Sequence, residues 1–236
     1  MRTELRQSKA CPHLEDLVNR PMSIQHSERS ILDLCPLSAA AVPILYFGTQ
    51  FVAAPFYSGY SFSRHIASML GTRGSQYPWI FNGGMIIVGF AAFLGAIGLY
   101  RSFRPLTHPL VSWLIGFSVV FTGFMSIKAG LFPLPDPRHA SWGTFQVYDM
   151  IFTVLLMLIG LWRQGNGIWL RTYLLLSLTF ALLTIPLIFQ WTSVPLLKFG
   201  AIQRIAALSA MVPIGVVGYY FWRETRRGKS VVQGAT

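Results

Sequence analysis

The sequence has few charged residues. Only 11% of its 236 residues are charged, whereas 53% are hydrophobic, and the mean hydropathy is +0.50. Soluble domains carry about 25% charged residues, so this shortage excludes an ordinary soluble globular protein. The sequence also lacks a Walker loop, a GxSxG elbow and a Rossmann fingerprint. Nothing therefore supports chemistry driven by a nucleotide.

Cysteine and histidine are scarce as well. The two cysteines, Cys11 and Cys35, both precede the first apolar segment, so they form neither a disulfide framework nor a CxxC metal pair. The five histidines include no HxxxH or HExxH motif, and none lies near the middle of an apolar segment. A b-type haem is therefore disfavoured. We expect no cofactor and assign no metal site.

What the sequence does have is long apolar segments. A bilayer-spanning helix needs about 20 predominantly apolar residues, and six windows of about that length are separated by more polar connections. They cover residues 37–57, 80–100, 110–131, 144–162, 168–189 and 201–222. The sequence predicts an all-α fold, a polytopic integral membrane protein with six transmembrane helices in one bundle. Small residues of the second span, among them Gly89 and Gly95, are typical of close helix packing.

The three predicted parts of the chain are unequal in length. Residues 1–36 mix both signs of charge with little helical periodicity, so we expect a largely disordered tail rather than a cleaved signal peptide. Met22 follows Pro21 and is an alternative start. Residues 37–222 form the six-helix transmembrane domain, and residues 223–236 form a basic tail.

The positive charges are distributed unequally between the two sides of such a bundle. Thirteen Lys and Arg residues fall on the side of the termini, four fall on the other side, and two lie within spans. Because cytoplasmic loops carry an excess of Lys and Arg, we expect both termini in the cytoplasm and the protein in a plasma membrane. This bias also explains the net charge of +11, so we expect no nucleic-acid partner.

A proline-rich run lies between the third and fourth spans. It reads GLFPLPDPRHASWG over residues 130–143, and its prolines at 133, 135 and 137 exclude a helix through the run. We expect an ordered loop that faces outward and carries Asp136 and His139. A second long outward loop, residues 59–79, carries His65, and its segment 62–70 is predicted to form a short amphipathic helix that ends at Gly71.

Three charged residues fall inside predicted spans. They are Lys128, Asp149 and Arg204, and each charge costs about 2.5 to 3.5 kcal/mol at a helix centre, which makes it a candidate functional residue. All three belong to the outer layer of the bundle, together with Asn82. One interpretation is a polar pocket, in which the forked guanidinium of Arg204 binds a carboxylate or phosphate. The alternatives are a structural ion pair of Lys128 with Asp149, a snorkelling lysine, and a pair of Arg204 with Asp149.

The two outer-loop histidines admit two interpretations. His139 with Asp136, and His65 beside them, suggest an acid–base pair or metal ligands, since histidine titrates near neutrality. The spacing Asp136-x-x-His139 is a weak pattern, because the prolines prevent the two side chains from sharing a helix face. Ordinary hydrogen bonding within the loops is the simpler interpretation.

Several short motifs resemble a known family. They are Ser68-Met69-Leu70-Gly71, Tyr77-Pro78-x-x-Phe81-Asn82-Gly83-Gly84, and Gly130-Leu131-Phe132-Pro133 with Asp136 and His139, followed by Arg204 at the start of the last span. These motifs are similar to the S-x-L-G, F-N-x-G and G-x-F-P patterns of the prokaryotic multi-pass membrane proteins catalogued as domain of unknown function 998. The resemblance covers residues 37–222, and Met69 departs from it because an acid often stands there. It implies the topology and no activity.

These residues together lead to a functional hypothesis. We expect an outward-facing polar pocket that binds or handles a lipid or a small amphipathic anion, with membrane lipids as partners. Its ligand-binding residues are Asn82, Lys128, Asp149, Arg204 and His65. An enzyme that acts on lipid head groups through His139 and Asp136 is the first alternative. A small-molecule transporter is the second, although the broken helices typical of a midplane site are missing.

Overall fold

The structure is a computed structural model that describes residues 31–141, 143–164, 167–189 and 198–227. Six helices in this part of the chain are long and apolar enough to cross a membrane. They are α2 (Cys35–Ala53), α3 (Pro78–Phe103), α4 (Pro109–Leu131), α6 (Gly143–Leu161), α7 (Ile168–Ile188) and α8 (Phe199–Arg226). The described residues contain no strand. The predicted all-α bundle of six candidate membrane spans is confirmed.

Prolines set several of the helix boundaries. Pro78 and Pro109 occupy the first positions of α3 and α4, where the missing backbone donor costs nothing and the fixed φ angle favours the helix. The His108 side chain caps α4 by accepting a hydrogen bond from the Leu110 amide at 3.2 Å. At the end of α2 the chain tightens into the 3-10 turn η2 (Ala54–Phe56), which contains Pro55.

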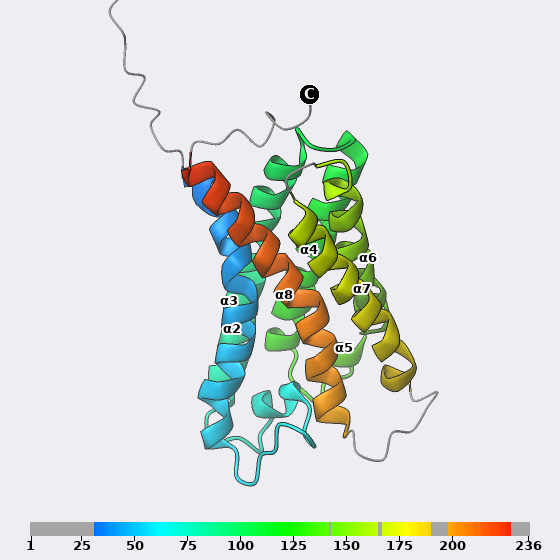
Figure 1. Cartoon of the computed structure of the whole chain (residues 1–236). Coiled ribbons are helices and arrows are strands. Elements are labelled where there is room, and N and C mark those ends of the chain that lie inside the picture. Colours follow the sequence, from blue (N-terminus) through cyan, green and yellow to red (C-terminus); the bar gives the residue numbers. More distant parts are fainter. Residues whose placement is uncertain (1–30, 142, 165–166, 190–197, 228–236) are drawn as a thin grey trace, which may run out of the picture.

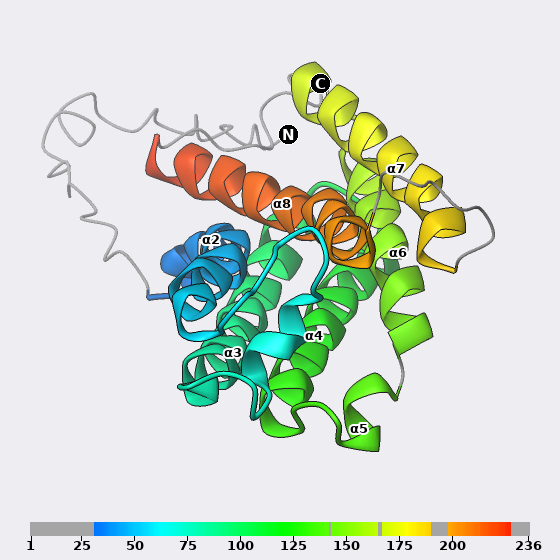
Figure 2. The same ribbon diagram turned by 90° about the horizontal axis from the view of Figure 1, so that it is seen from below.

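The six helices form a closed ring. Each packs against the next along the chain, and α8 packs against α2 to close the ring (Figures 1 and 2). Helix α2 begins and α8 ends at the same end of the bundle, which we call the termini end. The opposite end, the loop end, carries the long connection between α2 and α3 and the connection between α4 and α6 (Figure 1).

Glycines bring α2, α3 and α8 into close contact, as expected for the small residues of the second span. A Cβ atom on Gly95 of α3 would lie 2.7 Å from the Cα of Ala39, and one on Gly218 of α8 would lie 2.6 Å from the carbonyl oxygen of Pro36. Real Cβ atoms do not approach other atoms so closely, so these positions admit only glycine. We call this region the glycine seam.

The loop end differs in detail from the sequence prediction. Helix α4 ends at Leu131, the predicted end of the third span, but after a cis Leu134–Pro135 bond the short helix α5 (Pro137–Ala140) lies in the run that was predicted to be a loop. Asp136 caps α5 by accepting from the Arg138 amide at 2.8 Å. In the connection between α2 and α3, the short helix predicted over 62–70 is smaller and consists of the 3-10 turn η3 (Ala67–Gly71).

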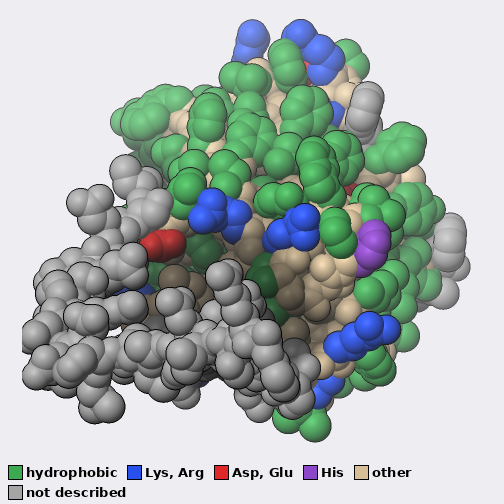
Figure 3. All heavy atoms as spheres, turned by 90° about the horizontal axis from the view of Figure 1, so that it is seen from above, with side chains coloured by type: hydrophobic (Ala, Val, Ile, Leu, Met, Phe, Trp, Pro, Cys, Tyr) green, Lys and Arg blue, Asp and Glu red, His purple; other side chains and the backbone are tan. Residues whose placement is uncertain are grey.

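The termini end carries several cationic side chains among hydrophobic ones (Figure 3). Helices α3 and α8 supply Arg101 and Arg223 in their last turns. The predicted tail lies outside the described residues up to position 30. Its last residues form the 3-10 turn η1 (Ile31–Leu34), and α2 begins at Cys35, two residues before the predicted start of the span.

Candidate functional site

A cavity of about 390 Å³ lies inside the ring toward the loop end. Helices α2, α3, α4, α6, α7 and α8 all contribute to its wall, and the connections that contain η3 and α5 cover it. Small-molecule sites occupy about 300 to 1,000 Å³ and are mostly apolar with a few polar groups. The cavity has the volume and the position of a ligand site.

Four methionines line the cavity. Met85, Met125, Met150 and Met211 come from four different helices, and all line the same space. Methionine is unbranched and polarizable, so a wall of this kind adapts to ligands of irregular shape. No sequence signal reveals this wall, because the four residues are far apart in the chain.

Serine, glutamine and histidine side chains supply most of the polar groups of the cavity. Ser68, Ser126, His139, Gln146 and Gln203 line it, and no Lys, Arg, Asp or Glu does so among the described residues. The Gln203 side-chain oxygen accepts a hydrogen bond from the Ala67 amide at 2.7 Å, which leaves the Gln203 amide N–H groups as donors. An uncharged ligand group fits this lining better than an anion, because a buried charge requires a partner.

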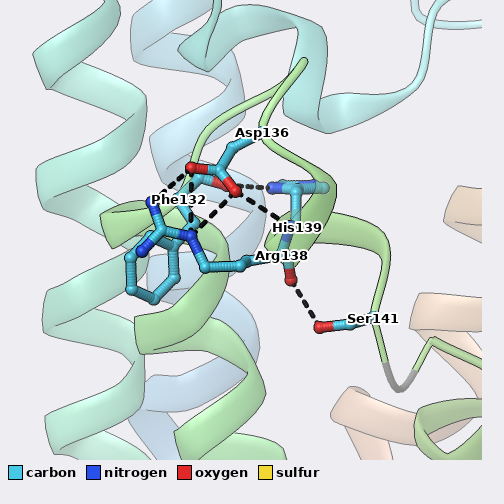
Figure 4. A network of polar contacts seen from close by, with 5 residues as sticks. All are labelled: Phe132, Asp136, Arg138, His139 and Ser141. Atoms are coloured by element: carbon cyan, nitrogen blue, oxygen red, sulfur yellow. Dashed lines mark hydrogen bonds and ion pairs between the residues drawn. The ribbon is translucent and has the colours of Figure 1, made fainter.

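His139 is the predicted site residue that lines the cavity. It lies on α5, and its Nδ1 is 2.8 Å from the carbonyl oxygen of Phe132 (Figure 4). A carbonyl only accepts, so the Nδ1–H of His139 donates this hydrogen bond, and in the tautomer that carries its proton on Nδ1 alone, Nε2 is an acceptor. His139 is half-buried. The cavity thus offers an acceptor from His139 and donors from Gln203.

Asp136 pairs with Arg138 rather than with the His139 ring. Arg138 donates to both carboxylate oxygens, with the shortest contact at 2.6 Å, and its guanidinium lies 4.0 Å from the centre of the Phe132 ring (Figure 4). The side-chain and backbone hydrogen bonds from Arg138 lower the pKa of Asp136 to about 2. Asp136 therefore orders α5, and the predicted Asp136–His139 acid–base pair is not among the contacts of the described residues.

Arg204 holds the connection between α2 and α3 against α8. Its Nη1 donates to the carbonyl oxygens of Phe62 at 2.6 Å and His65 at 2.9 Å, and to that of Gly200 in its own helix. Its Nη2 donates to the Tyr60 hydroxyl at 2.5 Å. Burial, opposed by the nearby guanidinium, raises the pKa of Tyr60 and keeps this phenol neutral. Backbone carbonyls and the Tyr60 hydroxyl, rather than Asp149, thus accept the hydrogen bonds of Arg204 among the described residues.

Other contacts fix the same loop. The Ala201 amide donates to the carbonyl oxygen of Ser63 at 2.9 Å, and a Cβ on Gly200 would lie 2.4 Å from the carbonyl oxygen of His65. The His65 ring accepts from the Ser61 amide at 3.1 Å, which is the loop hydrogen bonding that the simpler interpretation expects. Asn82 donates to the carbonyl oxygen of Gly71 at 3.1 Å and so joins α3 to η3.

Lys128 and Asp149 do not meet in the described part of the chain. Lys128 is 8% exposed, and its ammonium donates to the backbone oxygen of Ser141 and, at 3.0 Å, to the Ser141 hydroxyl. Asp149 instead accepts hydrogen bonds from hydroxyl groups of α4. Of the seven predicted site residues only His139 lines the cavity. No group of three or more His, Cys, Asp or Glu side chains among the described residues could hold a metal ion.

Comparison with known proteins gives one match. The family model described as Protein of unknown function (DUF998) matches residues 39–220. The match covers more than half of the chain, so the chain belongs to this family, as its motifs predict. No curated protein and no solved structure matches the chain.

Proposed function

We propose that this member of the DUF998 family binds an uncharged amphipathic lipid in the cavity at the loop end. The observation that carries the proposal is the composition of the wall: four methionines and other apolar groups, with hydrogen-bonding side chains and no charged one among the described residues. Apolar surface removed from water contributes about 25 cal/mol per Å². The lipid chain would contact the methionines.

The polar group of the ligand would lie near His139 and Gln203. A hydroxyl group needs one acceptor and one donor to satisfy it, and Nε2 of His139 and the amide of Gln203 are such a pair. A carboxylate or phosphate would lack a cation in the wall, since Arg204 and Lys128 donate to loop oxygens. The preferred class is therefore a long-chain or isoprenoid alcohol or ester rather than an amphipathic anion.

Lipid mass spectrometry of the purified protein tests this proposal. The wild-type protein should carry an uncharged amphiphile enriched over the bulk lipid. The variant Ala206→Phe, which projects a ring into the cavity wall, should retain about tenfold less of it, since overfilling a packed site costs about 1 to 3 kcal/mol.

A matched control comes from the same helix. Leu208 is 47% exposed and lies outside the cavity wall, so Leu208→Phe should leave the bound lipid unchanged. Equal lipid content in Ala206→Phe and wild type would refute the cavity as the binding site. Enrichment of an anionic lipid in place of an uncharged one would refute the ligand class.

We further propose that the protein resides in a plasma membrane with both termini in the cytoplasm. The excess of Lys and Arg on the side of the termini supports this orientation. A reporter fused after Pro137, in the connection that covers the cavity, should then give the signal of the outer side. A cytoplasmic signal at this position would reverse the orientation.

A further inference from the structure

A second hollow, of about 430 Å³, lies between α4 and α6. Asp149 lines it together with aromatic side chains, which are Phe117, Phe121, Phe145, Tyr148 and Phe152. We call it the aromatic groove. The cavity of the proposed function uses Gln146, Val147 and Met150 of α6, so the two hollows lie against different sides of this helix.

The aromatic groove faces outward from the ring. Phe117 is 61% exposed and Tyr148 is 53% exposed, although both belong to candidate membrane spans. In a bilayer such side chains contact lipid rather than water. Any ligand of the groove therefore arrives from the membrane.

Hydroxyl groups orient the Asp149 carboxyl in this groove. Ser118 donates to Oδ1, and Thr122 donates to Oδ2 at 3.0 Å. Both hydroxyls come from α4 and are almost completely buried. No Lys, Arg or His forms an ion pair with Asp149 among the described residues. Ionisable groups inside membranes ordinarily pair with one another or line a functional path.

The missing counter-charge and the aromatic walls point to the same ligand chemistry. An ammonium group is attracted to a carboxylate and also to the face of an aromatic ring. We propose that the aromatic groove binds an amphiphile with an ammonium head, such as a long-chain alkylamine, with Asp149 as its counter-ion. This site is independent of the cavity and of the proposed function.

The depth of Asp149 limits the size of the head group. It stands six residues after the start of α6, which corresponds to about 9 Å along the helix axis. A small primary or methylated amine on a single chain reaches this depth. Its chain then lies along Phe152 and Leu155 of the same groove.

Photolabelling of the full-length protein in lipid nanodiscs tests the proposal. The probes are a photoreactive alkylamine and the alcohol of the same chain length. In the wild type the amine should label peptides of α4 and α6. Asp149→Asn keeps the size of the side chain and removes its charge, and it should lower amine labelling about tenfold while alcohol labelling persists.

Equal amine labelling of Asp149→Asn and wild type would overturn the proposal and leave Asp149 as a polar link between α4 and α6. If Asp149→Asn does not fold, Phe117→Leu tests the proposal instead. Phe117 is exposed and its side chain has no polar atom, so the substitution breaks no hydrogen bond. It should lower amine labelling about threefold through the lost ring, and an unchanged value would overturn the proposal. Ala206→Phe should leave amine labelling unaffected, and a loss there would place the amine in the cavity instead.

Discussion

The glycine seam and the cavity wall differ in how closely the helices of one bundle pack. In the glycine seam, helix backbones approach so closely that a single added carbon has no room, as at Gly95 and Gly218. In the cavity wall, methionine side chains from four helices line an open space of about 390 Å³. We therefore expect the glycine seam to act as a rigid frame and the methionine-lined cavity wall to adapt more readily.

The largest expected effect comes from breaking the glycine seam. Gly95→Leu would place its Cβ 2.7 Å from the Cα of Ala39, and we expect a loss of about 3 kcal/mol in the free energy of unfolding. Thermal unfolding of the purified protein measures it. Gly48→Leu is the control, because nothing lies within 4 Å of a Cβ there and leucine favours the helix by up to about 1 kcal/mol. Equal stability of both variants would contradict the rigid frame.

An intermediate effect is expected where the loop that covers the cavity is attached to α8. Arg204→Ala leaves the carbonyl oxygens of Phe62 and His65 without their donor, which should cost about 2 kcal/mol. Trypsin cleavage after the exposed Arg64 and Arg73 should accelerate as the loop opens more often.

Two further variants sharpen this prediction. Arg204→Lys should restore only part of the protection, because an ammonium lacks the planar fork. Arg138→Ala, on α5, should leave the cleavage rate unchanged. If Arg204→Ala resists trypsin as well as the wild type does, the contacts of Gln203 and Gly200 are sufficient to attach the loop to α8.

The smallest expected effect concerns the exposed ion pair on α5. The pKa of Asp136 is lowered to about 2 by its hydrogen bonds from Arg138. A depressed pKa contributes stability that is present above the ordinary value near 3.8 and is lost as the pH falls toward about 2. The NMR shift of the Arg138 amide should titrate with a midpoint near pH 2 in the wild type and stay flat in Asp136→Asn. A midpoint near 3.8 would show that the pair does not persist in solution.

The spans were predictable because their signal is local. Hydropathy and length placed the third span at 110–131, and α4 occupies Pro109–Leu131. The α3 side of the glycine seam was predictable too, since its small residues recur along the second span, whereas the contribution of Gly218 from α8 was not predicted. The short helix α5 was harder to predict, because Pro137 excludes a continuing helix and at the same time starts a new helical turn.

The site was predictable only in part because its contacts are distant in sequence. Arg204 was singled out because a charge inside a span is costly. Its hydrogen-bond acceptors include backbone carbonyls more than 130 positions earlier, and the sequence does not indicate which carbonyls accept. One of the interpretations paired Asp149 with Lys128, since both lie near the same end of their predicted spans. The helix rotation that turns Asp149 toward Ser118 and Thr122 is set by packing and not by span length.

The closure of the ring by α8 also orders events in time. Ribosomes synthesise the chain from its N-terminus. Helix α2 and the loop of residues 57–77 are therefore made long before α8, the helix against which both pack. Until α8 arrives, α2 lacks one neighbour and the loop lacks the Arg204 donor. A nascent chain truncated before Phe199 would therefore expose an unfinished seam to the insertion machinery and to membrane proteases, whereas the complete chain would hide it.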